Sequence, residues 1–394
     1  MTQTKSGHLF ICMTDTNLPN GSGFAALGVA QKLVDSLTYH KLTQPTPIQQ
    51  AAIKPALEGN DILGIAQTGT GKTLAFALPM LQRLARIGGQ GLVVVPTREL
   101  ALQVEETLNL VGRAAKLLTV SLIGGASMHR QLQQLRRKPH VIIATPGRLL
   151  DHMRQKTVFM AGIKIVVLDE ADRMFDIGFA PHIKEILSAL PGERQTMLFS
   201  ATMPREILQI AAKYMKAPVR VEVAPENKSA TTVTHEQVMA PQSEKLPTLT
   251  SILKKEQGTV LVFSRTKHGA KKIAAAVRNA GHTATELHAN RTLAQRKAAL
   301  AGFKNGQYRV LVATDIAARG IDVTGIGLVI NYDLPTTVED YVHRTGRTGR
   351  AGRTGRALSF VTPDERSDVY RIEQRLRLRL QVMNHTNREP ARSH

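Results

Sequence analysis

The sequence predicts an α/β protein with two domains, each containing a doubly wound and mostly parallel sheet. The chain has 394 residues, a natural length for two domains of ordinary size. Short, continuous apolar runs recur along it, as expected for strands that are buried on both faces. Helical patterns, such as residues 101–118 and 270–280, separate these runs. The predicted strands are residues 92–95, 141–144, 165–168, 197–199, 260–263, 310–313 and 328–330.

The domain boundaries follow from where this alternation pauses. From about residue 218 to 247 the chain has proline, serine and charge without a long apolar run, which indicates a linker with at most an edge strand. We expect a disordered leader over residues 1–20, a first domain over 21–220, a linker over 221–245, a second domain over 246–364 and a basic tail over 365–394. A helical pattern over 369–375 runs into strict arginine–leucine alternation over 375–380, so the start of the tail stays open.

The composition points to a polyanionic partner. Lysine and arginine number 52 against 31 acidic residues, a formal net charge of +21. Such a charge repels itself and is typical of proteins that bind nucleic acid, although a basic surface kept for solubility is the alternative. The single cysteine, Cys12, excludes an intrachain disulfide framework and a cysteine zinc site. No apolar run approaches the ~20 residues of a membrane span. We therefore expect a cytoplasmic protein without a membrane partner.

The first chemical motif is a candidate phosphate loop. Residues 66–73 read Ala-Gln-Thr-Gly-Thr-Gly-Lys-Thr and lie between an apolar run and a helical pattern. Backbone N–H groups and the N-terminus of a helix can cradle phosphate in this setting. Lys72 would reach the β- and γ-phosphates, and the Thr73 hydroxyl would hold Mg²⁺. The alternative is a glycine turn that happens to precede Lys-Thr.

The second motif is a pair of acids that follows a buried strand. Residues 166–172 read Val-Val-Leu-Asp-Glu-Ala-Asp. Adjacent acids at the end of a buried strand are costly unless they have a function. Asp169 would bind Mg²⁺, and Glu170 would polarise an attacking water. The alternative is a pair of acids that stabilises the N-terminus of a helix.

Together, an alanine-led phosphate loop and Asp-Glu-Ala-Asp resemble the DEAD-box family of RNA helicases in superfamily 2, in its compact bacterial form. Further family motifs occur in order, at residues 96–100, 124–125, 145–148, 200–202, 262–266, 313–322 and 343–350. Most of them follow the carboxyl end of a predicted strand, where ligands bind in open α/β sheets. The resemblance implies two tandem RecA-like domains joined by a short linker. It also implies an ATP-dependent RNA helicase that locally unwinds RNA duplexes or remodels RNA–protein complexes.

The resemblance also implies a nucleotide site. Residues 45–49, Pro-Thr-Pro-Ile-Gln, resemble the motif that reads adenine, and the amide of Gln49 can pair with both edges of that base. Phe24 lies where the family has a stacking ring, with a hydrophobic staple as the alternative. Lys41 and Leu42 depart from the family pattern. The implied nucleotide-binding residues are Phe24, Thr46, Gln49, Thr68, Gly69, Thr70, Gly71, Lys72, Thr73 and Asp322.

Arginines near residue 350 have a clear chemical role in such a site. Phosphoryl transfer builds charge on the γ-phosphate, and an arginine from outside the phosphate loop stabilises it. By resemblance, Arg347 and Arg350 are these fingers, and His343 links the γ-phosphate region to the first domain. Ser200 and Thr202 would couple the domains. The alternative for residues 343–350 is a basic surface helix.

The implied RNA contacts are spread over both domains. They are Arg98, Gly125, Thr145, Arg148, Arg265, Arg296 and Thr314. Such contacts hold the phosphate backbone, so we expect low sequence specificity, with 2′-OH contacts distinguishing RNA from DNA. Ala289 and Leu293 depart from the family pattern in the second domain. The expected partners are single-stranded RNA and short duplexes, within ribosomal-precursor or RNA-decay complexes, and the expected state is a monomer.

The resulting hypothesis couples the two ligands. ATP and RNA would both bind across the two domains, so each would favour the closed state. Closure would complete the hydrolytic site, bend one RNA strand and open a short duplex, and hydrolysis would release the RNA. Two alternatives stay open, namely an ATP-dependent RNA clamp that hardly hydrolyses ATP and a DNA-directed superfamily 2 ATPase.

Overall fold

The computed structural model describes residues 23–67, 69–113, 116–223, 233–318, 323, 325–349 and 354–383, and the backbone of residues 10–12. The chain divides into two compact units, Met1–Pro225 and Glu226–His394, and this division lies inside the predicted linker. Among the predicted site residues, Thr68, Asp322 and Arg350 lie outside the described residues, as do most of the predicted leader and the end of the predicted tail.

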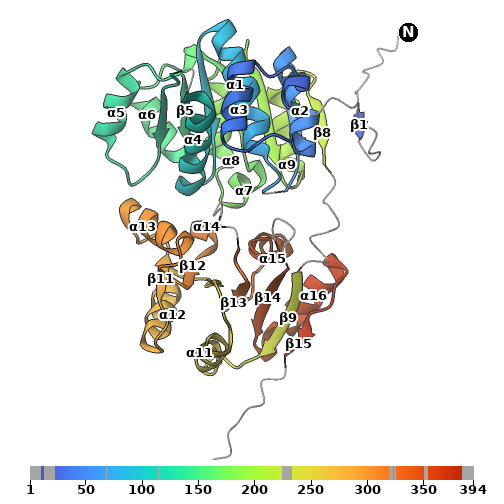
Figure 1. Ribbon diagram of the computed structural model, residues 1–394, viewed down its shortest axis with the longest axis vertical. Helices are drawn as coiled ribbons and strands as arrows, with labels where there is room; N and C mark the ends of the chain where they lie inside the picture. The colour runs from blue at the N-terminus through green and yellow to red at the C-terminus, as the bar shows by residue number, and fades with distance from the viewer. Residues whose placement is uncertain are drawn as a thin grey trace, which may run out of the picture. The chain divides into compact units, whose positions relative to one another are not determined.

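The first unit contains an eight-stranded parallel sheet (Figure 1). Its strand order is β1-β8-β2-β7-β6-β3-β5-β4. The strands are β1 Phe10–Cys12, β2 Ile62–Ile65, β3 Gln90–Val94, β4 Thr119–Leu122, β5 Val141–Ala144, β6 Ile163–Leu168, β7 Gln195–Ser200 and β8 Val219–Glu222. The backbone of β1 pairs with β8, so this part of the predicted leader is a strand.

Helices cover both faces of this sheet. They are α1 Gln31–Tyr39, α2 Pro47–Glu58, α3 Lys72–Ile87, α4 Arg98–Gly112, α5 Met128–Arg136, α6 Pro146–Arg154, α7 Ala171–Asp176, α8 Ala180–Ser188 and α9 Arg205–Tyr214, with the 3₁₀ turns η1 Ala25–Leu27 and η3 Met160–Gly162. Buried side chains of α1 to α4 form one apolar cluster, and those of α6 to α9 form another with the strands. Phe76 of α3 packs against Phe199 of β7, with ring centroids 5.7 Å apart. The strands are therefore buried on both faces, which explains their continuous apolar runs.

The second unit contains a seven-stranded parallel sheet with the order β11-β12-β10-β13-β14-β9-β15. The strands are β9 Val233–Met239, β10 Val260–Phe263, β11 Ala284–Leu287, β12 Val310–Ala313, β13 Leu328–Asn331, β14 Gly355–Val361 and β15 Gln381–Val382. β9 lies in the segment predicted as a linker, yet it pairs with β14 over seven residues. Only Val233 and Val238 of β9 are buried, so it lacks the apolar run that marks the other strands.

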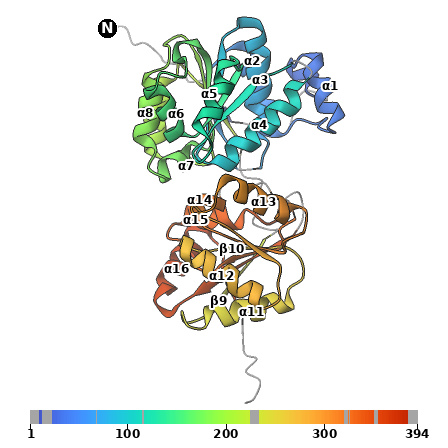
Figure 2. The same ribbon diagram turned by 90° about the vertical axis from the view of Figure 1, so that its left-hand side faces the viewer.

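The helices of the second unit also lie on both faces of its sheet. They are α11 Lys245–Lys255, α12 Lys267–Asn279, α13 Leu293–Lys304, α14 Asp315–Ala318, α15 Val338–Thr345 and α16 Arg366–Leu376, with the 3₁₀ turn η4 Pro363–Glu365. α11 and α12 share one apolar cluster and one face (Figure 2), whereas Phe303 of α13 packs into a different cluster. α16 and β15 lie in the segment predicted as a tail, and α16 is held there by buried Val369 and Ile372.

The two units have the same topology. Without β1, the first sheet reads β4-β5-β3-β6-β7-β2-β8, and the second reads β11-β12-β10-β13-β14-β9-β15. If the strands of each unit are numbered in chain order, with β1 left out, both sheets have the order 3-4-2-5-6-1-7. This confirms the predicted fold class, and it gives every strand of the second sheet a counterpart in the first. Within the described part of the chain, no helix has both the length and the apolar character that crossing a membrane requires.

Candidate nucleotide and RNA sites

The phosphate loop joins β2 to α3 in the first unit. Gly69 and Gly71 have φ angles of 92° and 90°, in the left-handed region that favours glycine. A Cβ atom at Gly71 would lie 2.4 Å from Nε2 of Gln49 and 2.9 Å from Oγ1 of Thr46. Glycine is therefore required at this position by both backbone conformation and space.

The N-terminus of α2 holds this loop. Thr46 Oγ1 donates to the carbonyl oxygen of Thr70 at 2.7 Å, and Gln49 Nε2 donates to that of Gly71 at 2.9 Å. Gln49 Oε1 accepts from Thr46 N at 2.9 Å, which completes a capping box. The amide predicted to read adenine thus shapes the phosphate loop here.

Phe24 is predicted to stack on a base. Its side chain is 3% exposed and belongs to the apolar cluster of Leu33, Leu37 and Ile53. A ring packed in this way has little free face for a ligand. Its position therefore favours the apolar alternative for Phe24.

The lysine of the loop lies close to the first acid. Lys72 is buried, and its Nζ donates to the carbonyl oxygen of Ala66 at 2.9 Å. Asp169 follows β6 directly, and burial raises its pKa to about 6, although the Lys72 ammonium acts in the opposite direction. A buried carboxylate beside the phosphate lysine, with Thr73 in the first turn of α3, fits a Mg²⁺ ion bound to nucleotide phosphates.

Glu170 has an unusual backbone conformation. Its φ and ψ angles are 52° and 51°, in the left-handed region, and it caps α7. Such a conformation costs about 1–3 kcal/mol in a non-glycine residue and often marks a functional position. Its Oε2 forms a buried ion pair with Nη1 of Arg173 at 2.6 Å. Arg173 was not among the residues predicted for the site.

Asp172 joins the acidic segment to the end of β7. Its Oδ2 accepts from Ala201 N at 3.1 Å and from Thr202 N and Oγ1 at 2.9 and 3.0 Å. In return, Asp172 N donates to Ser200 Oγ at 3.1 Å. The predicted coupling residues Ser200 and Thr202 are thus tied to an acid that the sequence motif contains but the prediction left without a role.

The four RNA candidates of the first unit follow β3, β4 and β5. The guanidinium of Arg98 lies over the Gly124–Gly125 backbone, where a Cβ at Gly125 would be 2.5 Å from its Nη1. Arg148 Nη1 donates to the carbonyl oxygen of Ala126 at 3.0 Å, and Thr145 caps α6. β3 pairs with β6, and β7 joins β6 to β2 in the same parallel sheet, so one edge carries both the phosphate loop and the RNA candidates.

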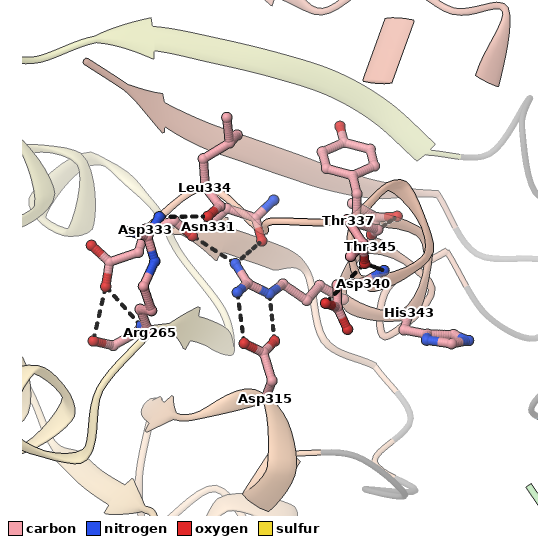
Figure 3. A network of polar contacts seen from close by, with 12 residues as sticks. Arg265, Asp315, Asn331, Asp333, Leu334, Thr337, Asp340, His343 and Thr345 are labelled. Atoms are coloured by element: carbon pink, nitrogen blue, oxygen red, sulfur yellow. Dashed lines mark hydrogen bonds and ion pairs between the residues drawn. The ribbon is translucent and has the colours of Figure 1, made fainter. Parts of the chain in front are cut away.

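A buried arginine organises the corresponding edge of the second unit. Arg344 Nε and Nη2 donate to Asp315 at 2.6 and 2.8 Å, and its Nη1 donates to Asn331 Oδ1 and Asp333 O at 3.2 and 2.6 Å. The guanidinium also lies over the ring of Phe263, 5.1 Å from its centroid. Figure 3 shows Asp315, Asn331 and Asp333 converging on this network.

Several residues of the predicted site contact or adjoin the Arg344 network, although they are not its members. Asp333 Oδ2 accepts from Arg265 N at 2.8 Å, and Thr314 immediately precedes Asp315. His343 points away from the network (Figure 3). Arg347 Nε donates to the carbonyl oxygen of His343 at 3.2 Å. Sequence reasoning missed Arg344 and its partners, although Arg344 lies within the 343–350 motif.

Arg296 occupies a separate position, at the start of α13. It is 6% exposed, and its Nη1 donates to the carbonyl oxygen of His288 at 3.1 Å. Arg291 and Arg278 lie close by and pair with buried Glu286. β11 is therefore flanked by arginines whose charge Glu286 partly neutralises.

Comparisons with known proteins agree with this geometry. Residues 46–210 match the DEAD/DEAH box helicase family, and residues 244–352 match the helicase conserved C-terminal domain. The chain is 40% identical to the DEAD-box ATP-dependent RNA helicase CshA of Bacillus cereus, over 92% of this chain and 69% of that protein. It is 42% identical to the ATP-dependent rRNA helicase RRP3 of Scheffersomyces stipitis, over 91% of this chain and 75% of that protein.

Solved structures show the same fold. Dbp5 of S. cerevisiae bound to RNA and ADP BeF3 has a TM-score of 0.82 at 30% identity, covering 92% of this chain and 96% of that one. The DEAD-box helicase Mss116 bound to ssRNA and UDP-BeF has a TM-score of 0.83 at 26% identity, covering 91% and 79%. With 40% identity over 92% of its length to such a helicase, the chain belongs to the DEAD-box family of ATP-dependent RNA helicases.

Proposed function

We propose that this protein hydrolyses ATP to ADP and phosphate and uses the reaction to unwind or remodel RNA locally. The observation that carries the proposal is the placement of Lys72 beside buried Asp169, at the carboxyl edge of the first sheet. A phosphate-binding lysine next to a carboxylate is the pairing that an ATP site with a metal ion requires. Membership of the family supports the same reaction.

The proposed chemistry divides among the residues of the site. Lys72 and the N–H groups of the loop bind the phosphates, and Glu170 orients and polarises the attacking water. Mg²⁺ held by Thr73 and Asp169 would supply charge neutralisation on the phosphate oxygens. Arg347 and Arg350 stabilise the charge that builds on the γ-phosphate, and His343 lies beside them in the chain.

The RNA is proposed to run along residues from both units. Thr145 follows β5, and Thr314 follows β12, which is the counterpart of β5 in the second sheet, so these two predicted contacts occupy equivalent places. Arginine and hydroxyl groups there bind phosphates rather than bases, so specificity for sequence is low. Both solved relatives described above carry RNA. Because each ligand draws on residues of both units, binding of one favours binding of the other.

The oligomeric state, the location in the cell and the physiological RNA are proposed from the sequence. We propose a monomer that acts in the cytoplasm, without a membrane partner, on single strands and short duplexes. The rRNA helicase among its relatives supports RNA of ribosomal precursors as a substrate, and RNA-decay complexes are the other candidate.

The proposal is tested by steady-state ATPase activity with single-stranded RNA, with matched DNA and with neither. We expect stimulation by RNA and not by DNA, and opening of a short RNA duplex in the presence of ATP. Glu170→Gln is expected to lower hydrolysis by about 10²–10⁴-fold while ATP binding persists, because it removes the general base.

Each alternative has its own outcome. Stimulation by DNA alone would identify a DNA-directed ATPase. An unwinding rate that Glu170→Gln leaves unchanged would identify an RNA clamp that works without hydrolysis. ATP binding without stimulation by either nucleic acid would leave only a nucleotide-binding protein.

A further inference from the structure

The common topology of the two units gives the phosphate loop a counterpart in the second unit. β9 corresponds to β2, so α11 corresponds to α3. Lys72 is the first residue of α3, and Lys245 is the first residue of α11. Likewise β13 corresponds to β6, so Asp333, two residues after β13, corresponds in place to Asp169 after β6. The second unit thus carries a lysine and an acid at the positions of a phosphate site.

A cavity of about 920 Å³ occupies this position. It opens at the carboxyl ends of β10, β13, β14 and β9, which are four adjacent strands. This is the edge at which open α/β sheets bind ligands, and the volume lies in the range of small-molecule sites. Its polar lining includes Lys245, Arg265, Lys272, Asp333 and Glu365. Three cations and two carboxylates give it a net charge of 3 − 2 = +1.

The floor of the cavity is built from groups that bind one another. Lys245 is 1% exposed, its Nζ donates to the carbonyl oxygen of Tyr332 at 3.1 Å, and it lies 3.6 Å from Glu365 Oε2. Glu365 Oε2 also accepts from Thr362 N at 3.0 Å. Asp333 Oδ2 accepts from Ser264 Oγ at 3.1 Å. The floor is therefore preorganised, and its charges are largely satisfied within the protein.

At the mouth of the cavity, in contrast to its floor, the side chains of Lys272 and Arg265 have N–H groups that are not hydrogen-bonded within the described chain. Lys272 makes no hydrogen bond or ion pair with the part of the chain that the structure describes. The side chain of Arg265 is 55% exposed. Its Nη2 donates to the carbonyl oxygen of Leu334 at 3.2 Å and lies 3.6 Å from Glu365 Oε1, whereas its Nε and Nη1 make no hydrogen bond with the described residues. Two such cations at the rim of a polar cavity favour an anion.

The loop between β9 and α11 determines which kind of anion the cavity can bind. In the first unit the glycines of the loop leave room for several phosphates, whereas the second unit has Pro-Gln-Ser-Glu over residues 241–244. Pro241 O accepts from Glu244 N at 2.9 Å and from Lys245 N at 3.1 Å, so these N–H groups are turned inward. These two N–H groups are therefore not available to the oxygens of a triphosphate. One phosphate, held at the mouth, is what the remaining donors can bind.

We propose that this cavity binds a phosphate monoester of the size of a nucleoside monophosphate, separately from the ATP site. The phosphate lies between Arg265 and Lys272, and the hydroxyls and carboxylates deeper in the cavity face the sugar. Acidic residues that accept from ribose hydroxyls at a strand end are a common arrangement in α/β nucleotide sites. The pocket lies wholly within the second unit.

The absence of tryptophan from the sequence allows a direct test. Gln242→Trp places a single tryptophan on the exposed rim of the cavity. The full-length variant is made with Lys72→Ala, which disables the phosphate loop, and is titrated with AMP and with inorganic phosphate. We expect a saturable change in tryptophan fluorescence. Lys272→Ala should weaken binding at least about tenfold, since it removes a charge-assisted contact.

Lys271→Ala is the matched control, since Lys271 is an exposed neighbour that does not line the cavity. It should leave affinity unchanged, and Lys272→Ala should leave RNA-stimulated ATPase activity unchanged. Tighter binding of AMP than of phosphate supports recognition of the nucleoside, and equal binding supports a site for phosphate alone. As a check on the fluorescent reporter, the same ligands should also raise the melting temperature of the chain that lacks Gln242→Trp.

Three results would overturn the proposal. One is the lack of a saturable signal and of a melting shift with either probe. Another is an equal loss of affinity in Lys271→Ala and Lys272→Ala, which would indicate diffuse attraction to a basic helix. The third is a signal that requires intact Lys72, which would report the ATP site. None of these bears on RNA-stimulated hydrolysis, so failure here is distinct from failure of the proposed function.

Discussion

Arg344 and Asp315 make a two-point contact in the second unit, with Nε and Nη2 of the arginine 2.6 and 2.8 Å from the two carboxylate oxygens. The side chain of Arg344 is 3% exposed and that of Asp315 is 24% exposed. This pair ties α15, which carries His343, to the end of β12, where Thr314 lies. A change at the pair should therefore affect both stability and the active site.

Asp315→Asn should lower the free energy of unfolding by about 3 kcal/mol, because it leaves the buried charge of Arg344 without its partner. Urea unfolding measures this loss. Arg371→Ala serves as control, since the Arg371–Asp368 pair is 56% and 40% exposed and such pairs contribute about 1 kcal/mol or less. Equal losses in the two variants would contradict the structural role of Arg344.

Gly71→Ala should lower ATP affinity at least about tenfold, since the added Cβ meets Gln49 and the φ of 90° disfavours alanine. Calorimetric titration with ATP measures the change. Gly192→Ala is the control, because no atom lies within 4 Å of its added Cβ and its φ is not in the left-handed region. Unchanged affinity in Gly71→Ala would show that the loop can rearrange at no cost.

Thr202→Val should reduce duplex unwinding more than ATP hydrolysis, because it removes the hydroxyl that donates to Asp172 at 3.0 Å but leaves Lys72 and Glu170 in place. The lost hydrogen bond should cost about 1 kcal/mol of stability. Parallel ATPase and unwinding assays measure the split. Thr202→Ser keeps the hydroxyl and should behave as the wild type, and equal loss of both activities in Thr202→Val would exclude a coupling role.

Arg98→Ala should weaken binding of single-stranded RNA and reduce the steepness of its salt dependence by about 0.7, the contribution of one phosphate contact. Fluorescence anisotropy at several salt concentrations measures both. Arg154→Ala is the control, since Arg154 has a 65% exposed side chain near Glu185, away from the strand ends. An unchanged slope in Arg98→Ala would remove Arg98 from the RNA site.

His152 should make stability fall in mild acid. It is fully buried near Gln131 and Thr157, and burial lowers its pKa from 6.5, with the charge of Arg148 acting in the same direction. Below pH 6.5 the imidazole of His152 therefore takes up a proton in the unfolded chain more readily than in the folded chain. The stabilisation by neutral His152 is complete above pH 6.5 and is lost as the pH falls towards the lower pKa of the folded chain. His152→Gln should show a flatter stability profile in that range by urea unfolding at stepped pH. Parallel profiles would place the titration elsewhere.

The sequence predicted well wherever a local pattern corresponds to a local structure. Residues 141–144, 260–263 and 310–313 are strands with the predicted bounds, because a strand buried on both faces needs an unbroken apolar run. The loop at 66–73 and the acids at 169–170 lie at strand ends as expected. β9 lies inside the second sheet, although its segment was predicted as a linker with at most an edge strand. The reason is that only two residues of β9 are buried, so its own sequence does not indicate the pairing with β14.

What the sequence determined by itself is the fold class and the family, because contiguous motifs encode them, and the same motifs predict the residues of the ATP site. Only the tertiary structure decided which of those residues work together. Gln49 supports the phosphate loop, Asp172 holds Thr202, and Arg344 joins the ends of β12 and β13 through partners 11 to 29 residues away. The physical reason is that buried polar groups must find hydrogen-bond partners, and which groups become neighbours depends on strand order rather than on distance along the chain.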